Sequence, residues 1–197
     1  MLFRSSPDSL AKQEKIVHDR PPMLAIGVMI WLGSELMFFS GLFAALFTIR
    51  AHLAAWPPKG THLDVLQSGI FTLILISSSF TLHWAETSIK RGNRFGLKAG
   101  MLSTFLLGCT FLFIQINEYA NIGFAPQDHA QQSIFYSLTG LHGAHVFIGL
   151  LILLSVTVRA FRGHYSPDSH RGVDVPGIYW HFVDIMWIVV FTTVYVL

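Results

Sequence analysis

The chain has 197 residues, of which 52% are hydrophobic and 12% are charged, whereas ordinary soluble domains contain about 25% charged residues. This composition excludes a disordered chain and argues against a soluble globular core. The net charge of +2 is too small and too scattered to indicate nucleic-acid binding, and the single cysteine, Cys109, excludes a disulfide framework or a cysteine-based zinc or redox motif within the chain. The sequence therefore predicts an all-α fold, a polytopic membrane helix bundle.

Residues 1–22 are expected to form a cytoplasmic N-terminal tail. The segment up to Arg20 is polar and contains no apolar stretch of the signal-peptide type. Pro21 and Pro22 follow it, and proline suits the opening positions of a helix. We therefore expect one membrane domain over residues 23–197.

Five apolar runs make up that domain, and each is long enough to cross about 30 Å of hydrocarbon. The connector after the first run contains Trp56-Pro57-Pro58, in which Trp56 is well placed for a membrane–water interface. A basic turn follows the second run, at 89–98. The predicted helices cover residues 23–49, 66–88, 99–117, 133–158 and 176–197.

The distribution of Lys and Arg predicts how the bundle is oriented. The tail carries four of the 13 Lys and Arg residues, the loop between the second and third helices carries four, and the loop between the fourth and fifth carries three. Only Arg50 and Lys59 lie on the opposite side. Because cytoplasmic loops carry an excess of Lys and Arg, we expect five spans with the N-terminus in the cytoplasm and the C-terminus outside.

Glu35 is the only Asp, Glu, Lys or Arg in the first apolar run. A charge at the centre of a membrane span costs at least about 2.5–3.5 kcal/mol on insertion scales. Glu35 is therefore expected to be protonated, paired with a neighbouring helix, or part of a site for proton or partner chemistry.

Two histidines of the fourth helix are expected at a depth similar to that of Glu35. His142 and His145 are three residues apart and so lie on one helix face. Counting the helix rise of 1.5 Å per residue places both, like Glu35, near the middle of the membrane, where the three side chains can meet.

The spacing of the two histidines allows two interpretations. It can hold a metal, but a di-metal carboxylate bundle would need Glu-x-x-His pairs on two helices, and the sequence has none. The structural alternative is that Gly140, Gly143 and Gly149 let helices approach closely while the histidines form hydrogen bonds across the interface.

A second polar layer, within about 10 Å of the cytoplasmic edge, is expected to contain His83, His181 and Asp184. His181 and Asp184 are also three residues apart. Such a pair can relay protons or form a neutral hydrogen-bonded pair between helices, and we favour the structural role. Glu118 is expected at the outer surface. The gap between these groups argues against a proton-conducting channel.

Five blocks of the sequence combine these polar residues with aromatic or small neighbours. They are Ser34–Phe39 (SELMFF), Trp56–Pro58 (WPP), Gln115–Tyr119 (QINEY), Thr139–Val146 (TGLHGAHV) and Tyr179–Trp187 (YWHFVDIMW). In this order, the blocks resemble subunit III of the haem–copper cytochrome c oxidases, and the resemblance covers about residues 21–197.

The resemblance implies an accessory subunit that has no haem or copper of its own and packs directly on subunit I, which carries the oxygen-reduction site. Haem a and copper would belong to the partner subunits I and II. The chain would hold phospholipid, sustain proton uptake and prevent inactivation during turnover. Glu35 falls on the family's mid-membrane, carbodiimide-reactive carboxyl. A small fourth subunit or a respiratory supercomplex would be a further partner.

The resemblance is to the five-helix form of that subunit. The mitochondrial form has seven helices, and this chain is expected to lack the first two, which form one arm of a lipid cleft. The five-helix form indicates a bacterial plasma membrane and an aa3- or caa3-type oxidase. Ser34-Glu35 and Trp56–Pro58 favour this branch over the quinol oxidases, whose third subunit also has five helices. An alternative of another class is a membrane metalloenzyme that uses Glu35, His142 and His145.

Overall fold

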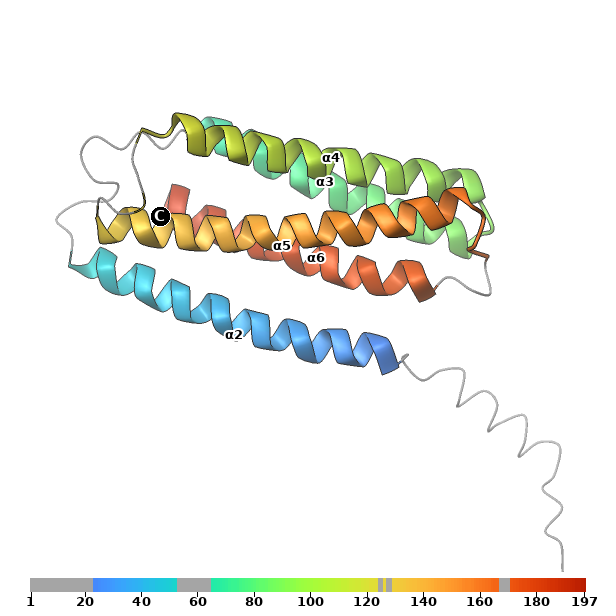
Figure 1. Cartoon of the computed structure of the whole chain (residues 1–197), viewed down its shortest axis with the longest axis horizontal. Helices are drawn as coiled ribbons and strands as arrows, with labels where there is room; N and C mark the ends of the chain where they lie inside the picture. The colour runs from blue at the N-terminus through green and yellow to red at the C-terminus, as the bar shows by residue number, and fades with distance from the viewer. Residues whose placement is uncertain (1–22, 53–64, 124–125, 127–128, 167–170) are drawn as a thin grey trace, which may run out of the picture.

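The computed structural model describes residues 23–52, 65–123, 126, 129–166 and 171–197. Within these residues the chain folds into five long helices and no β-strand, and all five helices are long and apolar enough to cross a membrane (Figure 1). The helices are α2 (Met23–Ala51), α3 (Val65–Lys90), α4 (Arg94–Asn121), α5 (Ala130–Phe161) and α6 (Arg171–Phe191), which ends in a π-helical turn, η1 (Thr192–Val196).

The expectation of an all-helical, five-span bundle is thus confirmed, while the orientation of its ends stays a prediction. The predicted tail, 1–22, and the Trp56–Pro58 connector lie outside the described residues.

Helix α4 begins at Arg94, five residues before the predicted start. Asn93 caps it, because its side chain accepts a hydrogen bond from the backbone N–H of Gly96 at 3.0 Å. The preceding helix, α3, ends at Lys90. Gly92 follows it with a φ of 77°, which suits glycine, and the backbone N–H groups of Gly92 and Asn93 bond back to the carbonyls of Ile89 and Ser88. The basic residues of this turn therefore belong partly to α4.

Helix α6 also begins earlier than predicted, at Arg171 instead of near Pro176. Pro176 lies inside the helix. Asp174 lies in the first turn, where a carboxylate interacts favourably with the helix dipole. Its Oδ1 is 3.2 Å from Nζ of Lys90 at the end of α3. These contacts hold the turn before the proline in helical form.

Four of the helices form a ring. Each of α3, α4, α5 and α6 packs on two others of the ring, and α2 lies along its outside against α5 and α6 (Figure 1). Burial follows this arrangement, since 17% of the residues in the apolar window of α2 are buried and 56% of those in α6. Helix α6 is therefore the element around which the described bundle is packed.

Polar contacts between α6 and α3 lie along the interior of the ring. The buried indole N–H groups of Trp180 and Trp187 donate to the hydroxyls of Ser78, at 2.9 Å, and Thr72, at 3.0 Å. The two tryptophans are seven residues apart, which is about two helical turns, and so they lie on the same face of α6. These bonds fix the two helices against each other in rotation and in height.

Glycines of the neighbouring helices make room for the ring of Trp180. A Cβ at Gly108 of α4 or Gly149 of α5 would lie within 2.6 or 2.9 Å of the Trp180 ring. By contrast, no atom of the described residues lies within 4 Å of such a Cβ at Gly143. Of the three glycines expected to permit close helix approach, Gly149 is the one that a buried aromatic ring requires.

The contact between α6 and α3 gives a testable prediction. Replacing Ser78, which is fully buried, by alanine removes the acceptor for the Trp180 indole and leaves a buried donor unsatisfied, at a cost of about 1–3 kcal/mol. The matched control is Ser77→Ala, because Ser77 is exposed and donates only to the Leu73 carbonyl of its own helix. We expect Ser78→Ala to lower the melting temperature of the detergent-solubilised protein and Ser77→Ala to leave it unchanged. Equal melting temperatures for the two variants would contradict this assignment.

Candidate functional site

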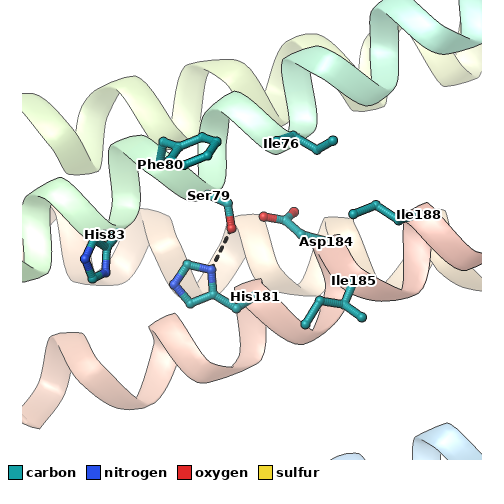
Figure 2. Close-up of a pocket in the computed structure, with 8 residues that line it drawn as sticks. All are labelled: Ile76, Ser79, Phe80, His83, His181, Asp184, Ile185 and Ile188. Atoms are coloured by element: carbon teal, nitrogen blue, oxygen red, sulfur yellow. Dashed lines mark hydrogen bonds between the residues drawn. The ribbon is translucent and has the colours of Figure 1, made fainter.

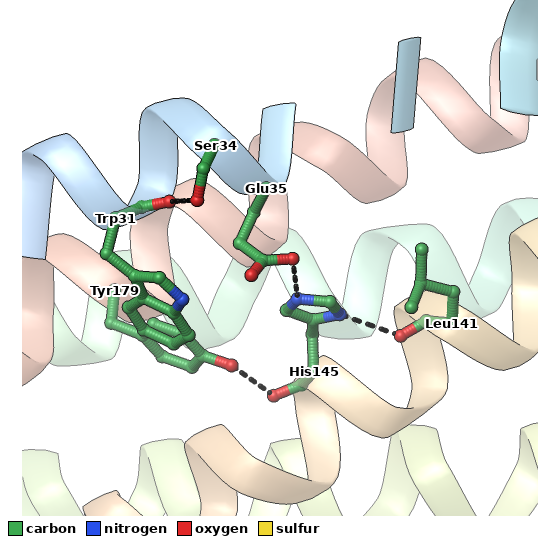
Figure 3. Close-up of polar contacts among 6 residues, drawn as sticks. All are labelled: Trp31, Ser34, Glu35, Leu141, His145 and Tyr179. Atoms are coloured by element: carbon green, nitrogen blue, oxygen red, sulfur yellow. Dashed lines mark hydrogen bonds and ion pairs between the residues drawn. The ribbon is translucent and has the colours of Figure 1, made fainter. Parts of the chain in front are cut away.

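Glu35 of α2 and His145 of α5 face each other across the contact between these helices. Oε2 of Glu35 lies 3.3 Å from Nε2 of His145 (Figure 3), at the long end of the range for a hydrogen bond. The side chain of His145 is 9% exposed and that of Glu35 is 24% exposed. The expectation that these two residues meet is confirmed, while their depth in the membrane stays a prediction.

The hydrogen bond made by Nδ1 of His145 shows which of its ring nitrogens carries a proton. Nδ1 lies 2.8 Å from the carbonyl oxygen of Leu141, which can only accept a hydrogen bond, so Nδ1 carries a proton. Because a bare Nε2 and an ionised carboxylate are both acceptors, a hydrogen bond between Nε2 and Glu35 requires one further proton on either atom. The pair is neutral overall whether that proton is on oxygen or on nitrogen, and it can therefore remain in the bilayer without an uncompensated charge.

Aromatic residues hold the pair in place. The Tyr179 hydroxyl donates to the backbone carbonyl of His145 at 3.0 Å, and the Tyr179 ring stacks on Trp31 of α2 with ring centroids 5.5 Å apart (Figure 3). The ring of Phe39 lies 5.4 Å from that of His145. Helices α2, α5 and α6 are thus joined at the level of Glu35.

His142 does not take part in this pair. It is 1% exposed, and its ring lies 4.8 Å from Trp187 and 5.9 Å from Phe111, the latter edge to face. Neither ring nitrogen has a hydrogen-bond partner among the described residues. The expected meeting of three side chains is therefore wrong for His142. Two residues three positions apart on a helix point about 60° away from each other, which is enough to turn one histidine toward α2 and the other into the core.

His83, His181 and Asp184, which were expected in one polar layer, all line a cleft between α3 and α6 (Figure 2). The expected Asp184–His181 pair, however, is not formed: Nδ1 of His181 is 2.6 Å from the hydroxyl of Ser79, across the helix contact. Because α6 begins at Arg171, Asp184 lies about 20 Å along the helix, close to its middle. Its depth in the membrane stays a prediction.

Glu118 of α4, whose expected place at the outer membrane surface stays a prediction, is partly buried within the bundle. Its Oε1 accepts a hydrogen bond from the Tyr195 hydroxyl at 3.2 Å. The carboxyl thus fastens the end of α4 to the π-helical turn that follows α6.

Sequence reasoning missed Glu86, the one acidic residue of α3. It lies one helical turn before Lys90, and its carboxyl packs so closely on Gly177 of α6 that a Cβ there would overlap it. The four-residue spacing from Lys90 was the available signal, but it equally describes an exposed ion pair on a helix surface. Only the packing of α6 shows that the carboxyl is enclosed.

Within the described parts of the chain, no three His, Cys, Asp or Glu side chains converge in a group that can hold a metal ion. The metalloenzyme alternative needed Glu35, His142 and His145 together, and the orientation of His142 does not provide that ligand set. The site that does form is a carboxyl–imidazole pair, which can hold or exchange a proton.

Comparison with known proteins adds to this geometry. The family described as Cytochrome c oxidase subunit III matches residues 14–197. The cytochrome c oxidase subunit 3 of Thermostichus vulcanus is 41% identical over 181 residues, which cover 91% of this chain and 90% of that protein. The cytochrome c oxidase subunit 3 of Synechocystis is 42% identical over 182 residues, covering 91% and 78%. The probable cytochrome c oxidase subunit 3 of Mycobacterium tuberculosis is 42% identical over 181 residues, covering 90% and 89%.

Proposed function

This chain belongs to the cytochrome c oxidase subunit III family, and we propose that it serves an aa3- or caa3-type oxidase of a bacterial plasma membrane. As a member of this family it is an accessory subunit of an oxidoreductase complex, without catalytic residues of its own. It packs on subunit I, and haem a and copper belong to subunits I and II. Five apolar spans, bacterial relatives and the Lys and Arg distribution support this placement.

The observation that carries the proposal is the family match over residues 14–197, which includes every span of the bundle. The five sequence blocks that carry the resemblance lie within that match. Three of them contribute directly to the site: Glu35 comes from the first, His145 from the fourth, and Tyr179 from the fifth.

The Glu35–His145 pair supports a role in sustaining proton uptake by the neighbouring subunit. It holds one exchangeable proton at no net charge, and the Glu35 side chain is 24% exposed on the outside of the ring. His83, His181 and Asp184 lie apart from this pair in the α3–α6 cleft, and Glu118 lies near the end of α4. This separation favours a proton held locally over a path through the whole bilayer.

A groove between α4 and α5 supports the lipid-binding part of the proposal. It has a volume of about 300 Å³ and is lined only by apolar side chains and Cys109. Phe113, Phe147 and Leu151 stand exposed along it. Such a surface suits the acyl chain of a phospholipid, which offers apolar contact without hydrogen bonds.

Purification through a tag on this chain tests the proposal. In mild detergent we expect haem a absorbance and copper to arrive with other subunits and to leave when this subunit is stripped off. Cytochrome c, not quinol, should reduce the purified complex. Haem b or haem o together with quinol oxidation would move the chain to the quinol branch, and metal retained by the stripped chain would contradict an accessory role.

Carbodiimide labelling tests the role of Glu35. Hydrophobic carbodiimides enter the bilayer and add to a protonated carboxyl group, so the partly exposed Glu35 should be labelled. We expect Glu35→Gln to abolish label on this chain while leaving assembly and initial turnover largely intact. Asp184→Asn is the control and should keep the label, since Asp184 is only 4% exposed. Label that persists in Glu35→Gln would place the reactive carboxyl elsewhere.

A further inference from the structure

The cleft between α3 and α6 has features that the proposed role of Glu35 does not use. Its volume is about 400 Å³. Most of its walls are apolar, and Phe80 of α3 and Ile185 of α6 are 72% and 60% exposed along its rim. At its floor lie the Ser79–His181 hydrogen bond and the carboxyl of Asp184 (Figure 2).

Asp184 is buried and unsatisfied. Its side chain belongs to a residue that is 4% exposed, and neither carboxyl oxygen has a hydrogen-bond partner among the described residues. Figure 2 shows the carboxyl pointing across the cleft toward α3, beside Ser79. The Ser79 hydroxyl is bonded to His181 and forms no hydrogen bond of ordinary geometry with Asp184. A buried acceptor without a donor is an unusual feature in a folded protein and calls for an explanation.

The depth of the carboxyl limits what can satisfy it. Asp184 lies about 20 Å from the start of α6, and Ser79 lies about 17 Å from the end of α3 at Lys90. In a hydrocarbon core about 30 Å thick, these positions are far from lipid headgroups and bulk water. Acyl chains carry no hydrogen-bond donor. With the neighbouring Ser79 hydroxyl bonded to His181, the remaining source of a donor at this depth is a side chain on another membrane-spanning helix.

We propose that the α3–α6 cleft is a docking surface for a membrane-spanning helix of a partner subunit, which inserts an N–H or O–H donor side chain toward the carboxyl of Asp184. The apolar rim packs on that helix, and Asp184 fixes its height, because a donor one turn away would leave both groups unpaired. This inference rests on the proposed function, since it presumes an oxidase complex with other membrane subunits. The α3–α6 cleft thus differs from the α4–α5 groove, which is lined by apolar side chains and Cys109 and is proposed to face lipid.

Photocrosslinking in the purified, haem-containing complex tests the surface. The photoreactive residue p-benzoylphenylalanine replaces Phe80 in the cleft or, as a matched control, Phe113 in the α4–α5 groove, since these phenylalanines are 72% and 73% exposed. We expect the probe at position 80 to form an adduct that maps to a membrane-spanning segment of another subunit, and the probe at position 113 to form adducts with lipid. Lipid adducts alone from position 80 would overturn the proposal. The haem spectrum of the same preparation reports independently on membership of an oxidase.

Substitutions at Asp184 test the hydrogen bond. Asp184→Asn keeps an acceptor oxygen, whereas Asp184→Leu removes it at similar size. We expect washing in detergent to release the Leu variant about threefold to tenfold more readily than wild type, as for the loss of one interhelical hydrogen bond, and the Asn variant to behave as wild type.

The melting temperature of the full chain alone separates docking from internal stability. Neither carboxyl oxygen of Asp184 forms a hydrogen bond of ordinary geometry within the described residues, so the Leu variant should melt no lower than wild type. A fall in melting temperature, or retention in the complex equal to that of wild type, would show that the carboxyl does not serve docking.

Discussion

Buried hydrogen-bond donors in a bilayer must find their acceptors within protein, and this constraint fixes α6 against α3. The indole groups of Trp180 and Trp187 bond to Ser78 and Thr72, and His181 bonds to Ser79. In lipid, the hydrophobic effect does not drive helices together, so packing and such bonds determine how they assemble. These bonds set the rotation of α6 about its axis, which turns Tyr179 toward His145 and Asp184 toward the α3–α6 cleft. The α2–α5 contact and the α3–α6 cleft both depend on that orientation.

The two surfaces differ in how their polar groups are satisfied. At the α2–α5 contact, Glu35 and His145 are hydrogen-bonded to each other and form a pair without net charge inside the chain. At the α3–α6 cleft, the Asp184 carboxyl is left without a donor in the described structure. A satisfied pair is consistent with a proton held within this subunit, and an unsatisfied carboxyl is consistent with a contact made only in the assembled complex.

The sequence predicted the five spans and the polar residues that they carry, because hydropathy identifies long apolar runs and the few polar side chains within them. Apart from the contact between Glu35 and His145, it did not predict the partners of those residues. The spacing of His142 and His145 defines a helix face. It does not show that His145 contacts Glu35 of α2 while His142 packs on Trp187, because these contacts depend on where the neighbouring helices lie. The run Ser77-Ser78-Ser79 likewise gives no sign that its three hydroxyls bond to α3 itself, Trp180 and His181 in turn. Pairing across helices depends on their rotation, which no local pattern encodes.

A density map of the whole oxidase, purified through this chain, would test the account most directly. The account predicts a membrane-spanning helix of another subunit over the α3–α6 cleft, with a donor atom within hydrogen-bond distance of Asp184. It also predicts that every haem and copper is bound by other chains. A cleft filled by acyl chains, or a cofactor coordinated by His142 or His145, would contradict it.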